Sequence, residues 1–271
     1  YFCTMISKTK NQGILFVLAL LLVGCGQYQK LLRSDDVALK YTFVDSLYKD
    51  KKFKKALPLM EQIVPIYRGK PQAEPLMFRY ANTFYNLGDF YLAGYQFERF
   101  TASYPNSDSL EIAAFRSVQS YYALSPKFSL DQKDTFTALE KLQGFVDKFP
   151  DSEYRQSCNA MVLELKSKLE RKDFDIAQQY LRISDYKAAI NAYENFIKDH
   201  PGSIYRKDAY FGRLEAAFML AENSVSYLIK ERLEAAQKHY QSFLKNYGDS
   251  DKRGAAEELL LKIKTRLESL S

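Results

Sequence analysis

Residues 76–105 read LMFRYANTFYNLGDFYLAGYQFERFTASYP, and this stretch decides the fold. Apolar residues recur at intervals of three and four on both sides of Gly88-Asp89, as amphipathic helices require. These residues are Met77, Tyr80, Ala81 and Phe84 before the pair, and Ala93, Phe97 and Phe100 after it. Glycine and aspartate suit a turn between two helices, and Pro105 ends the second helix. The stretch therefore predicts a helical hairpin.

The second helix of this hairpin recurs along the chain. Its anchor alanine is matched at five places: Ala56, Ala93, Ala138, Ala189 and Ala236. The residues four positions later are Met60, Phe97, Leu142, Tyr193 and Tyr240, and those seven positions later are Ile63, Phe100, Phe145, Phe196 and Phe243. Such offsets trace one face of an α-helix, and a small alanine on that face indicates a close contact with another helix. We therefore expect five hairpins.

Four of these helices end in the same kind of turn. The turns are Tyr104-Pro105-Asn106-Ser107, Phe149-Pro150-Asp151-Ser152, His200-Pro201-Gly202-Ser203 and Tyr247-Gly248-Asp249-Ser250. In each, a helix breaker and a turn residue come before a serine that can cap the following helix. These turns divide the chain into successive hairpins.

The pattern resembles the tetratricopeptide repeat, in which small residues let two antiparallel helices approach each other closely. The anchors lie 37 to 51 residues apart, farther than the usual repeat of about 34, so we expect extra segments. Leu124–Lys133 should lengthen the turn of the third unit, and Glu222–Ile229 that of the fifth. Glu153–Arg171 is expected to be a long helix that runs into the fourth unit, and Gly254–Leu270 a capping helix.

The predicted fold class is all-α, a tetratricopeptide-repeat solenoid of about five hairpins with a C-terminal capping helix. We divide the chain into four parts: a leader (1–24), a lipidated linker (25–36), repeat units one to three (37–150), and a last part (151–271) with the long helix, units four and five and the cap.

The amino end has the layout of a bacterial secretory signal. Two lysines precede an apolar run from Ile14 to Val23, which is too short for a stable membrane span. The run ends in Leu22-Val23-Gly24-Cys25, which resembles the lipobox, so we expect the Cys25 thiol to receive a diacylglycerol. An ordinary secretory peptide or a short anchor is the alternative. Within the leader, residues 1–4 precede Met5 and are treated as an upstream extension.

Composition and motifs argue against catalysis and nucleic-acid binding. The formal net charge is +6, and it falls to +4 when the two leader lysines are left out. The remaining 37 basic and 33 acidic residues form a mixed-charge surface, unlike that of a basic nucleic-acid binder. Neither His200 nor His239 belongs to a metal-binding spacing, and no phosphate-binding or nucleophile motif is present. We predict a protein that is not an enzyme, with no cofactor or metal apart from the lipid on Cys25.

A lipobox followed by five irregular repeats over residues 22–270 resembles the BamD family of lipoproteins, which act in outer-membrane β-barrel assembly. The resemblance implies a chain anchored to the outer membrane and facing the periplasm, and the absence of an acidic residue at Gly26 or Gln27 agrees with this location. It also implies two partners: unfolded outer-membrane proteins, and the periplasmic domains of a BamA-like barrel subunit. A lipoprotein that scaffolds cell-envelope or division proteins is the alternative, and a glycan-binding lipoprotein is a more distant one.

Two surfaces follow as candidate sites. The first helices of a tetratricopeptide array line a groove that suits an extended peptide. The expected groove residues, in units one and two, are Tyr41, Phe78, Arg79, Asn82, Tyr85 and Asn86. Phe78 and Tyr85 have an alternative role in the core between repeats. The expected docking residues, in units four and five, are Arg182, Lys187, Arg206, Lys207 and Arg213, for which a solvated surface is the alternative.

Overall fold

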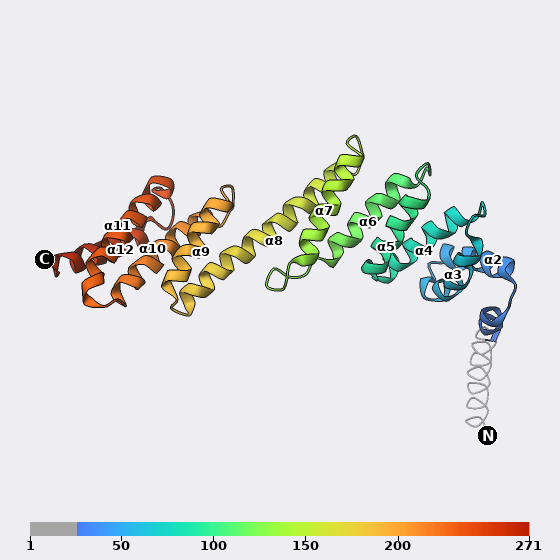
Figure 1. Ribbon diagram of the computed structural model, residues 1–271, viewed down its shortest axis with the longest axis horizontal. Helices are drawn as coiled ribbons and strands as arrows, with labels where there is room; N and C mark the ends of the chain where they lie inside the picture. Colours follow the sequence, from blue (N-terminus) through green and yellow to red (C-terminus); the bar gives the residue numbers. More distant parts are fainter. Residues whose placement is uncertain (1–25, 271) are drawn as a thin grey trace, which may run out of the picture. The chain divides into compact units, whose positions relative to one another are not determined.

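The computed structural model describes residues 26–270, and within this range the regular secondary structure is helical (Figure 1). Residues 26–33 form a short helix. The later helices are α2 (Val37–Lys49), α3 (Phe53–Tyr67), α4 (Ala73–Leu87), α5 (Phe90–Ser103), α6 (Leu110–Leu124), α7 (Lys133–Lys148), α8 (Arg155–Arg182), α9 (Tyr186–Asp199), α10 (Arg206–Glu222), α11 (Ser226–Tyr247) and α12 (Arg253–Glu268). The leader and Cys25, and so the predicted lipidation site, lie outside the described residues.

The chain forms two compact units, which we call unit 1 and unit 2 and which are distinct from the five repeat units. Unit 1 contains the described residues up to Leu124 together with Glu140–Tyr154, and unit 2 contains Ser125–Leu139 and Arg155–Ser271. Each has cores in which buried side chains of successive helices meet. No helix in residues 26–270 is both long enough and apolar enough to span a bilayer.

The predicted anchors lie at fully buried positions of the fold. All five alanines are completely buried, and so are most residues four and seven positions after them. Phe97 and Phe100 of α5, for example, meet the edge of the Phe78 ring from α4, with ring centroids 5.8 and 5.5 Å apart. A small side chain at one position brings the helices together, and large rings fill the space beside it. The predicted solenoid of helical hairpins is confirmed.

In three of the four serine turns the serine Oγ accepts a hydrogen bond from the amide two residues later, whereas Ser250 Oγ in the fourth has no partner among the described residues. Two of the turns add a contact that the sequence analysis did not include. Ser107 Oγ accepts a hydrogen bond from the Ser109 amide and donates one to Glu74 Oε1 in the first turn of α4, at 2.6 Å. Ser152 donates in the same way to Glu111 of α6 at 2.5 Å. A hydroxyl that donates to a carboxylate makes a strong hydrogen bond. The end of a hairpin is therefore tied to its beginning.

The insertions take two different forms. The turn between α6 and α7 is long, as expected, and is fastened within unit 2 by Lys172 Nζ, which donates to the Leu130 carbonyl at 2.7 Å. The long helix is also confirmed, because α8 runs without a break to Arg182. The expectation for Glu222–Ile229 was wrong: α11 already begins at Ser226, so the extra residues lengthen a helix and not a turn.

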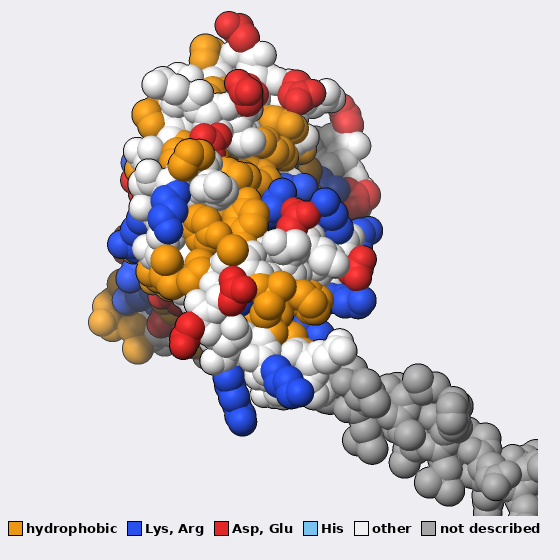
Figure 2. Space-filling model, turned by 90° about the vertical axis from the view of Figure 1, so that its right-hand side faces the viewer, with side chains coloured by type: hydrophobic (Ala, Val, Ile, Leu, Met, Phe, Trp, Pro, Cys, Tyr) orange, Lys and Arg blue, Asp and Glu red, His pale blue; other side chains and the backbone are white. Residues whose placement is uncertain are grey.

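The two ends of the described chain are packed. Part of the predicted linker is helical, and Leu31 in it is buried against α2 and α3. Asp36 caps α2 by accepting a hydrogen bond from the Leu39 amide. At the other end, α12 buries Ala256 and Ile263 against the last hairpin. The end of the molecule that carries α2 and α3 shows hydrophobic side chains next to groups of lysine and arginine (Figure 2).

Candidate functional site

The first helices of unit 1 share a polar face at which α2 and α4 are linked. Arg79 of α4 forms an ion pair with Asp45 of α2, with an N–O distance of 2.8 Å, and lies over the Tyr48 ring. The Asn82 amide donates to the Tyr48 hydroxyl, and the Asn86 side chain donates to the Asn82 carbonyl. Arg79, Asn82 and Asn86 are spaced three and four residues apart, so they form one stripe along α4.

Two of the predicted aromatic groove residues point mainly into the core. Tyr41 packs against Tyr67 of α3 with ring centroids 5.1 Å apart, and Phe78 packs against α5. Both rings are partly buried beside core clusters. The alternative role in the core therefore describes Phe78 well, and Tyr85 is partly buried against the same cluster as Phe78.

Tyr85 extends the polar face from α4 to α6. Its ring meets Phe90 on one side, and the guanidinium carbon of Arg116 lies 4.9 Å from the ring centroid. Arg116 also donates to the Gln119 side chain at 3.2 Å. Among the described residues Arg116 forms no ion pair, whereas Arg79 is held by Asp45. The free cation of this face is therefore Arg116.

Sequence reasoning missed Arg116 although a signal was present. The dipeptide Phe78-Arg79 recurs 37 residues later as Phe115-Arg116. The same 37 residues separate the starts of α4 and α6. Following that spacing into α6 would have placed a second arginine on the same face.

The charge of the face is not uniform. The Lys49 hydrogen bond, with a further contribution from the charge of Arg79, holds the pKa of Asp45 below its usual value despite some desolvation. Asp45 is therefore an ionised partner for Arg79 at neutral pH. On the α2 side Lys49 and Arg79 share this one carboxylate, whereas on the α6 side Arg116 forms no ion pair among the described residues.

The five predicted docking cations of unit 2 have different environments. Arg206 and Arg213 both lie over the Tyr210 ring, each with its guanidinium carbon 5.2 Å from the centroid. Arg213 also donates to Ser242, faces Glu194 at 3.6 Å, and has a side chain only 12% exposed. Lys207 pairs with Asp251 at 2.7 Å. These three cations are engaged within the unit.

Arg182 and Lys187 are the two accessible members of the set. Both are exposed, and neither forms an ion pair among the described residues. Arg182 stands at the rim of a hollow of about 500 Å³ between α8, α10 and the start of α12, which is also lined by Asp208 and Glu215. Of the five predicted docking cations, these two are the ones exposed to a partner.

The remaining candidates for chemistry have structural surroundings. His200 Nε2 lies 3.0 Å from Asp173, and its ring packs on Phe196. Cys158 is buried, and burial raises the pKa of its thiol. In residues 26–270 no group of three or more histidine, cysteine, aspartate or glutamate side chains is placed to hold a metal ion.

With this fold and polar face described, comparison with known proteins identifies the family. A family model described as outer membrane lipoprotein (YfiO) matches residues 34–226, which is more than two thirds of the chain. The chain belongs to the YfiO family of outer membrane lipoproteins. The resemblance to the BamD family that the sequence showed is thereby confirmed.

Individual proteins are also similar to this chain. The chain is 27% identical over 223 residues to the outer membrane protein assembly factor BamD of Rickettsia prowazekii (strain Madrid E), covering 78% of this chain and 85% of that protein. It is 25% identical over 126 residues to the BamD of Caulobacter vibrioides (strain ATCC 19089 / CIP 103742 / CB 15), covering 46% of this chain and 41% of that protein. A crystal structure of the P58(IPK) TPR domain aligns with a TM-score of 0.40 and 17% identity, over 89% of this chain and 68% of that one.

Proposed function

We propose that this YfiO-family chain is a non-enzymatic subunit of the machinery that assembles β-barrel proteins in the outer membrane. A lipid on Cys25 would hold it at the periplasmic side of that membrane. Unit 1 would bind segments of unfolded barrel proteins, and unit 2 would dock on a BamA-like barrel subunit. Family membership and the names of the relatives support the general role.

One observation carries the substrate assignment: Arg116, which forms no ion pair among the described residues, lies over the Tyr85 ring of α4. Strands of outer-membrane barrels alternate apolar and polar residues, so an unfolded barrel presents an extended peptide. A peptide that ends in an aromatic residue needs an aromatic contact, backbone hydrogen bonds and a cation for its carboxylate. Tyr85, Asn82 and Arg116 supply these three kinds of group.

A double-mutant cycle with a synthetic carboxy-terminal barrel peptide tests this assignment. We expect the parent chain to bind the peptide in the micromolar range, about 8 kcal/mol by calorimetry. Arg116→Gln should weaken binding at least tenfold, or about 1.4 kcal/mol, and amidation of the peptide's carboxylate should do the same. The two changes together should cost little more than either alone, because each removes the same ion pair.

Arg99→Gln is the matched control, since Arg99 lies over Tyr95 on α5, away from the polar face of the first helices. It should leave the affinity unchanged. Full additivity of Arg116→Gln and amidation would show that the carboxylate binds elsewhere. Binding of muropeptides in place of the barrel peptide would favour the scaffold alternative.

The docking half of the proposal is supported by the exposed charges of Arg182 and Lys187. Long cations at a protein surface suit carboxylates on a partner domain. Arg182→Glu combined with Lys187→Glu should reduce co-purification of the barrel subunit from detergent-solubilised membranes. The control variant is Lys230→Glu with Lys238→Glu on α11, which makes an equal change in charge at exposed positions. It should not reduce co-purification. Equal recovery with both variants would remove Arg182 and Lys187 from the interface.

A further inference from the structure

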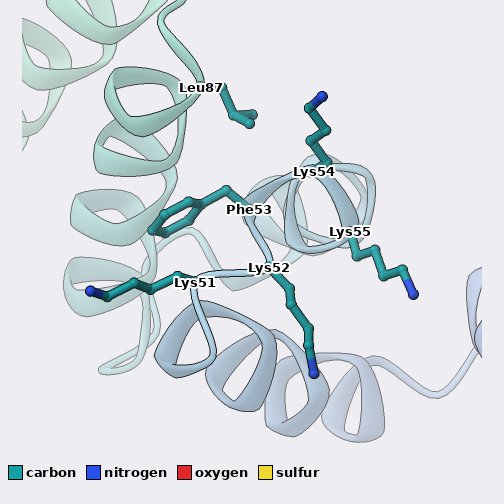
Figure 3. A pocket seen from close by; sticks show the side chains of 6 residues that line it. All are labelled: Lys51, Lys52, Phe53, Lys54, Lys55 and Leu87. Atoms are coloured by element: carbon teal, nitrogen blue, oxygen red, sulfur yellow. The ribbon is translucent and has the colours of Figure 1, made fainter.

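The turn between α2 and α3 gathers positive charge around an aromatic ring. Four exposed lysines flank Phe53 in what we call the lysine turn (residues 51–55): Lys51, Lys52, Lys54 and Lys55. With Leu87 from the end of α4 they line a shallow hollow of about 420 Å³ (Figure 3). Phe53 is half-buried and meets the Tyr48 ring edge-on, with centroids 5.6 Å apart. The ring at the centre is thus held by the hairpin.

Most of this charge is not neutralised within the protein. Lys52 pairs with Asp50, with an N–O distance of 2.9 Å. Among the described residues, Lys51, Lys54 and Lys55 form no ion pair. The lysine turn therefore presents free ammonium groups to its surroundings.

The directions of these side chains distinguish between two kinds of anionic ligand. Lys51 and Lys55 extend to opposite sides of the turn, and so do Lys52 and Lys54 (Figure 3). A single phosphate or carboxylate needs donors that converge within hydrogen-bonding distance. Ammonium groups that spread apart suit an extended surface with many separate negative charges, such as a layer of anionic headgroups.

The position of the lysine turn in the chain indicates which surface it meets. The Tyr28 hydroxyl donates to the Lys55 carbonyl at 2.7 Å, and Lys55 Nζ lies 5.9 Å from the Tyr28 ring centroid. Leu31, three residues later, is buried in the same hairpin. Cys25 precedes Tyr28 by three residues, which span at most about 11 Å. A lipid on Cys25 therefore brings the bilayer surface close to the lysine turn.

We propose that the lysine turn docks on anionic phospholipid headgroups of the membrane that holds the anchor. This inference rests on the Cys25 anchor of the proposed function. The lipid keeps the chain at the bilayer, and the lysine turn fixes which side of the first hairpin faces it. Each lysine close to an anionic surface strengthens such docking about fivefold.

A fluorescent label on the lipidated protein tests the proposal. Lys54→Cys gives an accessible thiol, because Cys158 is buried and Cys25 carries the lipid. The labelled protein is reconstituted in vesicles of phosphatidylcholine alone and in vesicles with about 30 mol% phosphatidylglycerol, a typical anionic lipid. The anchor holds the protein to both, so any difference isolates the lysine turn. Lys187→Cys in unit 2 is the control label position.

We expect a blue shift of the position-54 label only on the anionic vesicles, lost at about 0.5 M NaCl, where charges are screened within a few ångströms. The double variant Lys51→Gln with Lys55→Gln should lower the equilibrium constant for docking on the anionic vesicles roughly 25-fold. The control variant Lys230→Gln with Lys238→Gln should leave that constant unchanged. Equal spectra on both vesicles, an equal shift at position 187, or a shift caused by inorganic phosphate alone would overturn the proposal. Failure of the anchor itself would differ, since the protein would then leave both kinds of vesicle.

Discussion

The guanidinium carbon of Arg116 lies 4.9 Å from the centroid of the Tyr85 ring, so an arginine of α6 covers an aromatic residue of α4. A guanidinium that stacks through its face keeps its N–H donors in the plane of the group. One of these donors is taken by Gln119. The others remain for a planar acceptor such as a carboxylate. A ring and an anion can therefore be bound side by side on this face.

Removing the ring and a neighbouring amide should abolish peptide binding without unfolding the protein. Asn82→Ala with Tyr85→Ala leaves every anchor alanine and turn proline in place, so circular dichroism should stay helical. Calorimetric binding of a carboxy-terminal barrel peptide should be lost, as it should when the peptide lacks its terminal Phe. Unchanged affinity in the double variant would move the substrate to another face or to another subunit.

Two glycines within helices should respond to alanine in opposite directions. A Cβ on Gly212 of α10 would lie 2.5 Å from the Tyr193 ring, which is only 2% exposed and cannot move freely. Gly212→Ala should therefore lower the free energy of unfolding by about 1 to 2 kcal/mol. Gly144→Ala in α7 meets nothing within 4 Å and should raise it by up to about 1 kcal/mol through helix propensity. Urea denaturation measures both, and stabilisation by Gly212→Ala would contradict the packing described.

The anchor alanines predict a strong dependence on side-chain size. Ala93 of α5 is completely buried, so Ala93→Phe should overpack the contact between helices and lower the free energy of unfolding by roughly 1 to 3 kcal/mol. Ala235→Phe, one residue before an anchor but exposed, is the matched control and should change it little. A melting temperature unaffected by Ala93→Phe would mean that Ala93 lies at the surface.

His239 should make the protein less stable in mild acid. Burial, with a contribution from Arg213, lowers the pKa of His239 to about 4. As the pH falls below about 6.5, the unfolded chain binds a proton that the folded chain does not, so stability is lost down to about pH 4. From pH 7 to 4.5 the parent should lose about 1 to 2 kcal/mol more than His239→Gln, allowing for partial exposure. Parallel pH profiles would show that His239 is freely solvated.

Charge reversal at Arg213 should affect the fold. Arg213→Glu would place a carboxylate beside Glu194 and remove the cation over Tyr210, so it should lower the free energy of unfolding by about 3 kcal/mol. Arg182→Glu, at an exposed position, should change it by less than about 0.5 kcal/mol. Urea denaturation measures both changes in the free energy of unfolding. This difference shows why the accessible pair Arg182 and Lys187 gives a cleaner test of docking than Arg206 and Arg213.

The fold was predictable because its signal is local and repeated. Every anchor alanine shares its face with large residues at fixed offsets, and that periodicity defines the helices and their buried sides without further information. The polar face was harder to predict. Phe78 and Tyr85 share a face of α4 seven residues apart. Phe78 packs on Phe97 and Phe100 within α5, whereas Tyr85 meets Phe90 at the start of α5 and also lies under Arg116 of α6. Spacing along one helix does not say which neighbouring helix each ring meets.

Arg213 shows the same limit in unit 2. Its sequence surroundings resemble those of a surface arginine, but Ser242 of α11 and Glu194 of α9 reach it from two other helices. Tertiary neighbours of this kind cannot be inferred from one sequence. The length of α11 is a further case, because residues 226–229 have enough helix-forming character to extend the helix once Leu233 is buried behind them.

The two serine-to-glutamate contacts span different lengths of chain. Ser107 and Glu74 are 33 residues apart, whereas Ser152 and Glu111 are 41 apart, and most of the additional residues lie in the 125–132 turn. The same closing contact thus forms around hairpins of unequal size. The 125–132 turn therefore takes up the difference in length, while the serine-to-glutamate contact keeps the same place at the two ends of the hairpin.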